Sequence, residues 1–374
     1  MAKSLLRRFT KKTALICTIC ICMLFLFALL IPKLNPVNWW LCGLLGLAVP
    51  YLSIILFLIF IFWLMAKPAL SLIPLFCLLA GYWQLSVLLA LNFSVAQPAE
   101  KPKGSIRIAS WNVANMYGLS NNPEVKKQNR LEISKTIHNV NADIICLQEF
   151  NHSYTQGTEA DNIGLFTDLY PYHYYSIDYN KNNGYYTNGS IIFSKKPILH
   201  KNAIAYKPTG AVKEHLLYSD FLLEKDTFRL YTTHLQSFSF TSSDYSDIEK
   251  IKAQDQEAVE ASKNILRKMR TAFTSRGAQA DLVHEAVQTS KYPVVICGDF
   301  NDVPNSYVYF NIRNTLQDAF LEKGFGTGKT YMKLAPFLRI DYLFADKKFD
   351  INQFQLIDEK LSDHAMLVTD MSWK

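Results

Sequence analysis

YPVVICGDFND, residues 292–302, is the stretch of sequence that most narrows the choice of fold. Residues 293–297 are apolar and rich in β-branched side chains, which is typical of a strand that is buried on both faces. Gly298 then breaks the strand, and Asp299 and Asn301 follow it. Side chains two positions apart lie on the same side of an extended chain, so we expect a carboxylate and a carboxamide together at the rim of a sheet, where ligands of α/β proteins bind. An ordinary strand-to-turn junction also favours Gly, Asp and Asn, and the stretch alone leaves both interpretations open.

The composition divides the chain into two parts. Residues 1–93 contain no Asp or Glu but seven Lys or Arg, which leaves 32 of the 39 basic residues and all 32 acidic residues for the remainder. The formal net charge of +7 therefore belongs to the N-terminal part, and the rest of the chain is neutral. The pI near 8.8 thus reflects cations that flank apolar segments, and not a basic surface for nucleic acid.

Apolar segments fill the N-terminal part, and they run over residues of about 13–31, 41–65 and 69–91. Each reaches the roughly 20 residues that a helix needs to cross the hydrocarbon core of a bilayer, so we expect three transmembrane helices in residues 1–93. A cleaved signal peptide is less favoured for the first segment, because its apolar run is long, no small-residue cleavage site follows and further apolar segments come next.

The cations that precede the first apolar segment indicate its orientation; they are Arg7, Arg8, Lys11 and Lys12. Such a cluster favours a cytoplasmic N-terminus, and three crossings would leave the remainder of the chain outside the cytoplasm. We therefore expect an integral protein of the plasma or inner membrane, in contact with membrane lipid, whose polar residues 94–104 form a linker to an extracytoplasmic domain over residues 105–374. Cys146 and Cys297 lie inside apolar strands of that domain, where an unpaired buried thiol is expected.

In residues 105–374, one pattern recurs: an apolar, β-type run is followed or preceded by a polar residue that can bind metal or phosphate. The residues are Asn112 in SIRIASWNVAN, Glu149 in ADIICLQEF, His234 in FRLYTTHLQS, Asp299 and Asn301 in YPVVICGDFND, Asp341 in RIDYLFAD, and Asp363 and His364 in LSDHAMLV. Each alone is explained by turn or surface chemistry. Together they supply the carboxylates that bind Mg²⁺ and two histidines for acid–base work, which is what a metal-dependent phosphoesterase requires.

The ordered motifs WNV, LQEF, GSIIFSK, THL, GDFND, RIDYLF and SDH resemble the endonuclease/exonuclease/phosphatase superfamily, whose members are deoxyribonuclease I-like, over residues of about 104–372. GDFND, RIDY and SDH are specific in combination and not singly. The resemblance implies an α/β fold, a two-layered β-sandwich flanked by helices, and a hydrolase that uses Mg²⁺, with Mn²⁺ as the alternative. The THL motif is similar to the deoxyribonuclease I and sphingomyelinase branches and differs from the exonuclease III branch.

The resemblance also implies a metal-binding group. Glu149 would be the principal Mg²⁺ ligand, with Asn112 beside it in the metal and phosphate network. Asp363 would be a second acidic group near the metal.

The remaining motif residues would act on the substrate. Asp299 would orient or deprotonate the attacking water, and Asn301 would hold the scissile phosphate. His364 would contact the phosphate or act as an acid or base. Asp341 would orient one of the two histidines, and His234 would be the second histidine.

The substrate stays open at this point. A phosphodiester is favoured, with a nuclease-like activity on nucleic acid as the first hypothesis and a sphingomyelinase-like lipid or inositol-phosphate phosphoesterase as the alternative. The neutral charge of the domain counts mildly against nucleic acid, while the apolar segments and an aromatic loop around Phe238 favour lipid. A non-catalytic, membrane-tethered binding module would be expected to lack one or more of the motif residues, and all of them are present.

Residues 238–290 depart from the compact family core, and their periodicity predicts a helix up to about Gln288.

Overall fold

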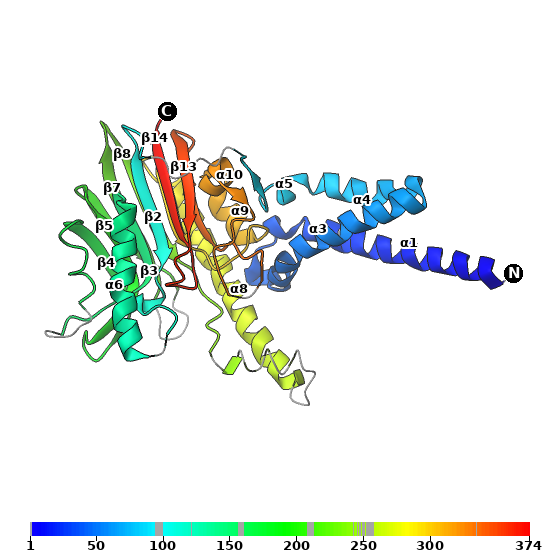
Figure 1. The fold of residues 1–374 in the computed structure, drawn as a ribbon, viewed down its shortest axis with the longest axis horizontal. Coiled ribbons are helices and arrows are strands. Elements are labelled where there is room, and N and C mark those ends of the chain that lie inside the picture. Colours follow the sequence, from blue (N-terminus) through cyan, green and yellow to red (C-terminus); the bar gives the residue numbers. More distant parts are fainter. Residues whose placement is uncertain are drawn as a thin grey trace.

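The computed structural model describes residues 2–93, 100–120, 122–155, 161–207, 213–241, 258–333 and 335–374, with a few positions between 243 and 251. Residues 94–99, which are most of the expected linker, lie outside the described residues. Two parts are visible in Figure 1: a sandwich of two sheets with helices on its outer faces, and a bundle of apolar helices that projects from one side of the sandwich.

The first sheet has six strands in the order β13 (Phe349–Ile357), β14 (Met366–Trp373), β2 (Ile106–Asn112), β3 (Ile144–His152), β5 (Tyr186–Ser194) and β4 (Tyr172–Lys181). Its central strands, β2 and β3, run parallel, and parallel neighbours need a crossover connection. Helix α6 (Pro123–Val140) provides this crossover and packs Ile133 and Ile137 against Trp111 and Ile145 on the outer face of the sheet. The Asn122 side chain caps the start of α6 by accepting a hydrogen bond from the Glu124 backbone N–H.

The second sheet has the order β10 (Gln317–Asp318), β12 (Asp341–Ala345), β9 (Val294–Asp299), β8 (Asp226–His234), β7 (His215–Leu223) and β6 (His200–Ala205). Its central strands, β8 and β9, are again parallel, and α8 (Ala258–Gln288) lies between them in the chain. The helix predicted to end near Gln288 is thereby confirmed. With α9 (Tyr307–Arg313), α8 covers the outer face of this sheet, where Val283 and Tyr309 pack against Ile296 and Phe344.

The inner faces of the two sheets form a common core. Fully buried side chains from both sheets meet there, among them Ile108, Cys146, Leu230 and Cys297. Both cysteines are free thiols, as expected from the sequence. The arrangement is the two-layered α/β sandwich flanked by helices that the sequence predicted.

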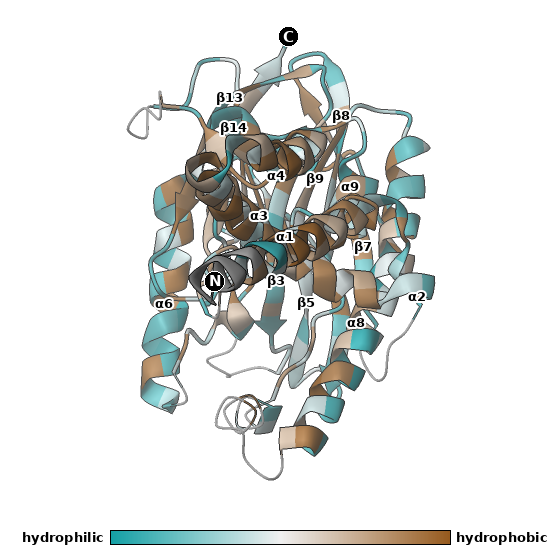
Figure 2. Ribbon diagram, turned by 90° about the vertical axis from the view of Figure 1, so that its right-hand side faces the viewer, coloured by the Kyte–Doolittle hydropathy of each residue, from teal (hydrophilic) through white to brown (hydrophobic). Residues whose placement is uncertain are grey.

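The N-terminal part holds two helical segments that are long and apolar enough to cross a membrane by length and composition, Phe9–Lys33 and Leu41–Ala66. The first segment comprises most of α1 (Ala2–Ala28) and the short helix η1 (Ile31–Lys33). The second segment is α3, which follows the single turn α2 (Pro36–Trp39). Figure 2, in which hydrophobic residues are brown, shows that α1, α3 and α4 consist mostly of such residues.

The third expected transmembrane helix, at residues 69–91, is not present as such. Helix α4 (Pro68–Ala80) has 13 residues and ends at Gly81, so it spans about 20 Å, short of the roughly 30 Å of a hydrocarbon core. The chain continues through α5 (Tyr82–Leu85) into β1 (Ala90–Leu91), which pairs with β11 (Phe325–Gly326) beside α10 (Ala319–Lys323). The expectation of three long apolar helices is therefore corrected to two, because residues 82–91 pack on the sandwich.

Candidate active site

The chemistry-bearing residues gather at one edge of the sandwich because of the strand directions. The parallel strands β2, β8 and β9 end there at Asn112, His234 and Asp299. Their antiparallel neighbours start at the same edge, so Asp341, the first residue of β12, pairs in register with Asp299, and His364 lies just before β14. The topology therefore brings residues from five separate motifs to one place.

Glu149 reaches this edge through an irregularity in β3. The register between β3 and β5 shifts between Leu147 and Phe150, and Glu149 takes a left-handed backbone conformation with φ 49°. Such bulges re-aim side chains next to functional sites. The Glu149 side chain is 32% exposed, whereas its flanking residues are buried.

Asn112 links the two sheets. Its side-chain Nδ2 donates to Glu149 Oε1 at 3.1 Å and to Asp299 Oδ2 at 3.0 Å. Its Oδ1 accepts from the Ala114 backbone N–H at 3.1 Å, at the start of the short helix η2 (Ala114–Met116). The Asn112 side-chain amide thus uses both its nitrogen and its oxygen in hydrogen bonds, and it holds one carboxylate from each sheet.

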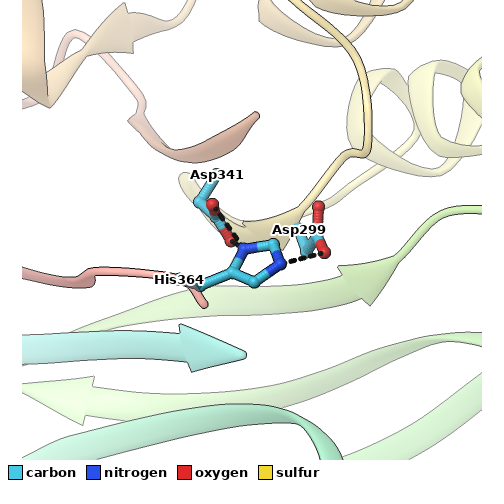
Figure 3. Close-up of side chains that lie close together, drawn as sticks. All are labelled: Asp299, Asp341 and His364. Atoms are coloured by element: carbon cyan, nitrogen blue, oxygen red, sulfur yellow. Dashed lines mark hydrogen bonds and ion pairs between the residues drawn. The ribbon is translucent and has the colours of Figure 1, made fainter. Parts of the chain in front are cut away.

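His364 lies between two buried carboxylates, as Figure 3 shows. Its Nδ1 donates to Asp341 Oδ2 at 2.9 Å, which directs Nε2 toward Asp299 Oδ2 at 3.7 Å. The His364 carbonyl accepts from Trp111 Nε1 at 2.8 Å, so the backbone is held as well. Burial alone would lower the pKa of His364, but the negative charges of Asp341 and Asp299 raise it to about 10.

His234 is the second histidine, and carboxylates surround it. Nδ1 lies 3.6 Å from Glu214 Oε1, and Nε2 lies 3.7 Å from both Glu149 Oε1 and Asp299 Oδ2. Nε2 is buried and has no hydrogen-bond partner among the described residues. Burial lowers the pKa of His234, but the charges of Glu214 and Asp299 outweigh burial and raise the pKa above its ordinary value.

Asp299 is the residue on which these contacts converge. It is 1% exposed, and burial, together with repulsion from Asp341, raises the pKa of its carboxyl group. Its Oδ1 accepts from the Asn301 backbone N–H at 2.8 Å. Asn301 itself has φ 53° and donates its side-chain Nδ2 to the Leu235 carbonyl at 2.9 Å.

Asp363 is placed differently from the other predicted site residues. Its Oδ2 pairs with Lys333 Nζ at 2.9 Å, and its side chain is 18% exposed. It lines the same cleft as Glu149 and Asp299, but its side chain pairs with Lys333, which also lines the cleft. The structure therefore brings together the other seven predicted residues through direct contacts and leaves Asp363 beside them.

These seven residues, called the catalytic set for the role that the sequence predicts for them, adjoin a cleft of about 780 Å³. Glu149, Asp299 and His364 line this cleft, and residues of α3 contribute to its wall. A hollow of similar size, about 790 Å³, lies around His152 and His173, and none of the predicted site residues lines it.

Comparison with protein families gives a match over residues 109–364 to the model described as the Endonuclease/Exonuclease/phosphatase family. The chain belongs to the endonuclease/exonuclease/phosphatase family. A second family model, for a domain of unknown function, matches residues 11–88. No curated protein matches the chain in a sequence comparison.

Solved structures show the same fold at low sequence identity. An endonuclease/exonuclease/phosphatase from Beutenbergia cavernae is 18% identical, with 72% of each chain covered and a TM-score of 0.52. The human nocturnin catalytic domain is 18% identical, with a TM-score of 0.51, over 73% of this chain and 96% of that one. A family protein from Bacteroides thetaiotaomicron is 14% identical, with a TM-score of 0.50, over 75% of this chain and 100% of that one.

Members of the endonuclease/exonuclease/phosphatase family are metal-dependent phosphoesterases, and the donor set here fits a divalent cation. Among the described residues, Asp299, Asp341 and His364 each offer one ligand atom, and these atoms lie within 4.8 Å of one another. His364 and Asp341 already satisfy each other by a hydrogen bond, however. Oxygen donors are the ligands that Mg²⁺ prefers, so Glu149, with Asp299 beside it, is the better-placed donor.

Two groups of site residues have no counterpart among the sequence predictions. Glu214 faces His234, but it precedes β7 without any motif, so only tertiary structure reveals it. Asn115 lies with its Nδ2 3.5 Å from Glu149 Oε2 and accepts at Oδ1 from Tyr186 Oη and Asn188 Nδ2. Asn188 directly precedes the GSIIFSK motif, and this position in the sequence could have indicated that it belongs to the site.

Proposed function

We propose that the chain is a divalent-metal-dependent phosphodiesterase that hydrolyses its substrate by direct attack of water. The observation that carries this proposal is the convergence on Asp299 Oδ2, which accepts from Asn112 and lies 3.7 Å from both His234 Nε2 and His364 Nε2. In the reaction, a water oxygen bonds to phosphorus and the bond from phosphorus to the leaving oxygen breaks. A phosphomonoester and an alcohol result.

Asp299 is proposed to take the proton of the attacking water. A general base works best when its pKa lies near the operating pH, and burial raises the pKa of Asp299 toward that range. The hydrogen bonds from Asn112 and from the Asn301 backbone fix the orientation of the carboxylate. Asn301 is proposed to contact the scissile phosphate from the turn that follows β9.

The two histidines are proposed to face the phosphate as cations. The surrounding carboxylates raise the pKa values of both rings, which favours the doubly protonated imidazolium form, and such a ring can stabilise phosphate oxygens or protonate the leaving group. Asp341 would orient His364, and Glu214 would orient His234. This pairing gives each histidine its own carboxylate.

Glu149 is proposed as the principal ligand of Mg²⁺, or of Mn²⁺, with Asn112 holding Glu149 in place and Asp363 as an outer acidic group. A bound divalent cation supplies Lewis-acid stabilisation of negative charge on the phosphate. The closeness of the buried Asp299 and Asp341, with Glu149 beside Asp299 on the Asn112 amide, supports the presence of a cation there, because closely spaced carboxylates repel one another.

Two substrate classes remain under this proposal. A nucleic acid is the first, as the nuclease-like motifs suggested. A lipid phosphoester is the second, and a specific observation favours it: α3, one of the two long apolar helices, lines the cleft that holds the catalytic set. For an inositol phosphate, or for a binding module without catalysis, no contact in the described residues gives comparable support.

The apolar helices are proposed to anchor the protein in a membrane. Helix α1 leads from the N-terminus to the sandwich, α3 leads away from it and the shorter α4 returns, so that the N-terminus and the sandwich lie at opposite ends of the bundle (Figure 1). Lys11, near the start of α1, and Lys67, which follows the end of α3, both lie at the end far from the sandwich, which supports a cytoplasmic location for that end. Alkaline phosphatase fused after Lys374 should then be active. This orientation would be contradicted if that fusion were inactive and a reporter that fluoresces only in the cytoplasm, fused at the same position, were fluorescent.

The enzymatic proposal is tested with the full chain in lipid nanodiscs and bis(p-nitrophenyl) phosphate as substrate. Hydrolysis should require Mg²⁺ or Mn²⁺ and stop with EDTA. Asp299→Asn and His234→Asn should each lower kcat by about a hundredfold or more. Asp226→Asn, at the exposed opposite end of the strand that carries His234, should match the wild type. Metal-independent hydrolysis, or full activity of the Asp299→Asn protein, would refute the proposal.

A further inference from the structure

Part of the wall of the cleft beside the catalytic set comes from the N-terminal helices. Residues Gly46, Leu47, Pro50 and Tyr51 of α3 line the same cleft as Glu149 and Asp299. The remaining residues of α3, 52–66, continue away from the sandwich along the bundle (Figure 1). One helix therefore runs from the cleft into the apolar bundle.

Close packing holds this part of α3 against the sandwich. A Cβ added to Gly43 would lie 2.4 Å from the ring of Phe273 in α8, so only glycine allows the helix to lie on that ring. Farther along, the Tyr51 ring meets the Phe337 ring edge-on, with 5.5 Å between centroids. The contribution of α3 to the cleft is thus a packed interface.

Apolar side chains also form part of the wall outside α3. Phe238 and Phe240 stack with their ring centroids 5.3 Å apart, and Phe238 packs edge-on against Phe273. Both stacked rings line the cleft, together with Phe337 and Leu338. Half-buried aromatic rings that face a cleft offer area to a hydrocarbon group.

The cations of the cleft are engaged with other groups of the protein. The lining cations are Lys126, Arg276 and Lys333. Arg276 is fully buried and bonds to Asp302, Lys333 pairs with Asp363, and Lys126 lies over the Tyr117 ring. A nucleic-acid strand needs cations along its phosphates, and each cation that lines the cleft among the described residues already has a partner within the protein.

We propose that the cleft takes a lipid phosphoester from the bilayer, with the hydrocarbon chain against Leu47, Tyr51 and Phe240 and the phosphate at Asn301 and His364. This inference rests on the proposed phosphodiesterase activity and names its substrate class. The α3 helix is then part of the binding site as well as an anchor. A lipid reaches the catalytic set along α3 without leaving the apolar surface.

The test uses the full chain in nanodiscs and a series of p-nitrophenyl alkyl phosphates with ethyl, octyl and tetradecyl chains. All share the p-nitrophenolate leaving group, so the chemical step is constant. Because each buried methylene contributes a factor of about three to four, kcat/KM should rise at least about tenfold from the ethyl to the octyl ester. Leu47→Trp, which fills the apolar wall, should remove most of this preference.

Leu58→Trp is the matched control, because Leu58 lies on α3 about three turns beyond Leu47, is 61% exposed and is outside the cleft. Partition of long-chain esters into the nanodisc is the same for both variants, so a lower octyl-to-ethyl ratio in Leu47→Trp alone supports the proposal. Phe240→Ala, on the facing wall, should also lower the ratio.

Three results would overturn the inference. They are a rate that does not depend on chain length, an equal loss of ethyl and octyl hydrolysis in Leu47→Trp and Phe240→Ala, and hydrolysis of DNA or RNA in preference to every lipid ester. In each of these cases, metal-dependent hydrolysis of the ethyl ester by the wild type would still support the phosphodiesterase proposal. Absence of all metal-dependent hydrolysis would instead refute that earlier proposal.

Discussion

At the scale of single residues, the buried pair of His364 and Asp341 ties stability to pH. The folded-state pKa of His364 is raised to about 10, whereas an unfolded chain would give about 6.5. A raised pKa means that the pair stabilises the fold fully below about pH 6.5 and that this contribution is lost as the pH rises through about 10.

The corresponding prediction concerns metal-free protein. Asp341→Asn removes the charge that raises the pKa of His364, so the variant lacks this pH-dependent contribution. In EDTA, the melting temperature of the wild type should exceed that of Asp341→Asn most near pH 6.5, and the difference should shrink toward pH 10. A difference that stays constant over this range would contradict the assignment.

Glu214 gives a second prediction at this scale. Its carboxylate faces His234 Nδ1 at 3.6 Å and accepts from Gln279 Nε2 at 2.9 Å. Glu214→Gln keeps the shape but removes the charge that favours the protonated ring, so kcat for bis(p-nitrophenyl) phosphate should fall about ten- to a hundredfold, with little change in KM. Because the His234 pKa falls when this charge is removed, the pH–rate profile of the variant should shift to lower pH. A purely structural role of Glu214 would not produce this shift. Glu224→Gln, an exposed residue in the following turn, should behave as wild type.

These residues also show how far sequence alone could define the site. Asn112, Asp299 and His364 were predictable because each belongs to a short motif at a strand end, and Glu149 because it belongs to the LQEF motif, which lies within β3. Glu214 was not, because its position beside His234 depends on how β7 and α8 pack and not on any local pattern. The Asp363–Lys333 pair was hidden for the same reason, since its partners are 30 residues apart.

At the scale of elements, the close approach of β8 and β9 depends on one glycine. Gly298 has φ 139°, and a Cβ added there would lie 2.0 Å from the Thr233 carbonyl oxygen. The obstacle is backbone of the neighbouring strand, so no side-chain rotation relieves it. The strand end that carries Asp299 therefore requires glycine at this position.

Gly298→Ala should lower the free energy of unfolding by about 3 kcal/mol or more, since both the left-handed conformation and the clash are unfavourable. Gly326→Ala is a matched control: Gly326 also has a positive φ, 82°, but a Cβ there would meet nothing within 4 Å. That variant should lose only about 1 kcal/mol. Equal destabilisation of the two proteins, measured by urea unfolding, would show that the clash with β8 is unimportant.

The strands and the crossover helices were predictable as elements, because buried runs and helical periodicity are local properties. The length of the third apolar segment was not. Residues 69–91 are apolar whether they face lipid or protein, and the composition could not reveal that Gly81 ends α4. Val87 and Ala90 are buried against the sandwich, and this packing explains the apolar character without a membrane.

At the scale of the whole molecule, the N-terminal part and the sandwich form one packed structure. Arg339 is 2% exposed and donates to Asp318 Oδ2 at 2.7 Å and to the Val87 carbonyl at 2.9 Å. Asn305 donates from Nδ2 to the Gln84 carbonyl at 2.9 Å. Residues 82–91 therefore complete buried polar networks of the sandwich, and they fix the orientation of the cleft relative to the helical bundle.

Truncation separates the contribution of this segment from that of the apolar helices. A fragment of residues 95–374 would leave buried donors of Arg339 and Asn305 without their acceptors, and each such loss costs about 1–3 kcal/mol. A fragment of residues 81–374 keeps those acceptors and strand β1. Urea unfolding should therefore show the shorter fragment to be less stable by about 3 kcal/mol or more, once the burial of Val87 and Ala90 is added. If both fragments unfold at the same urea concentration with the same slope, residues 82–91 are a passive connection and the cleft is not held in a fixed orientation by them.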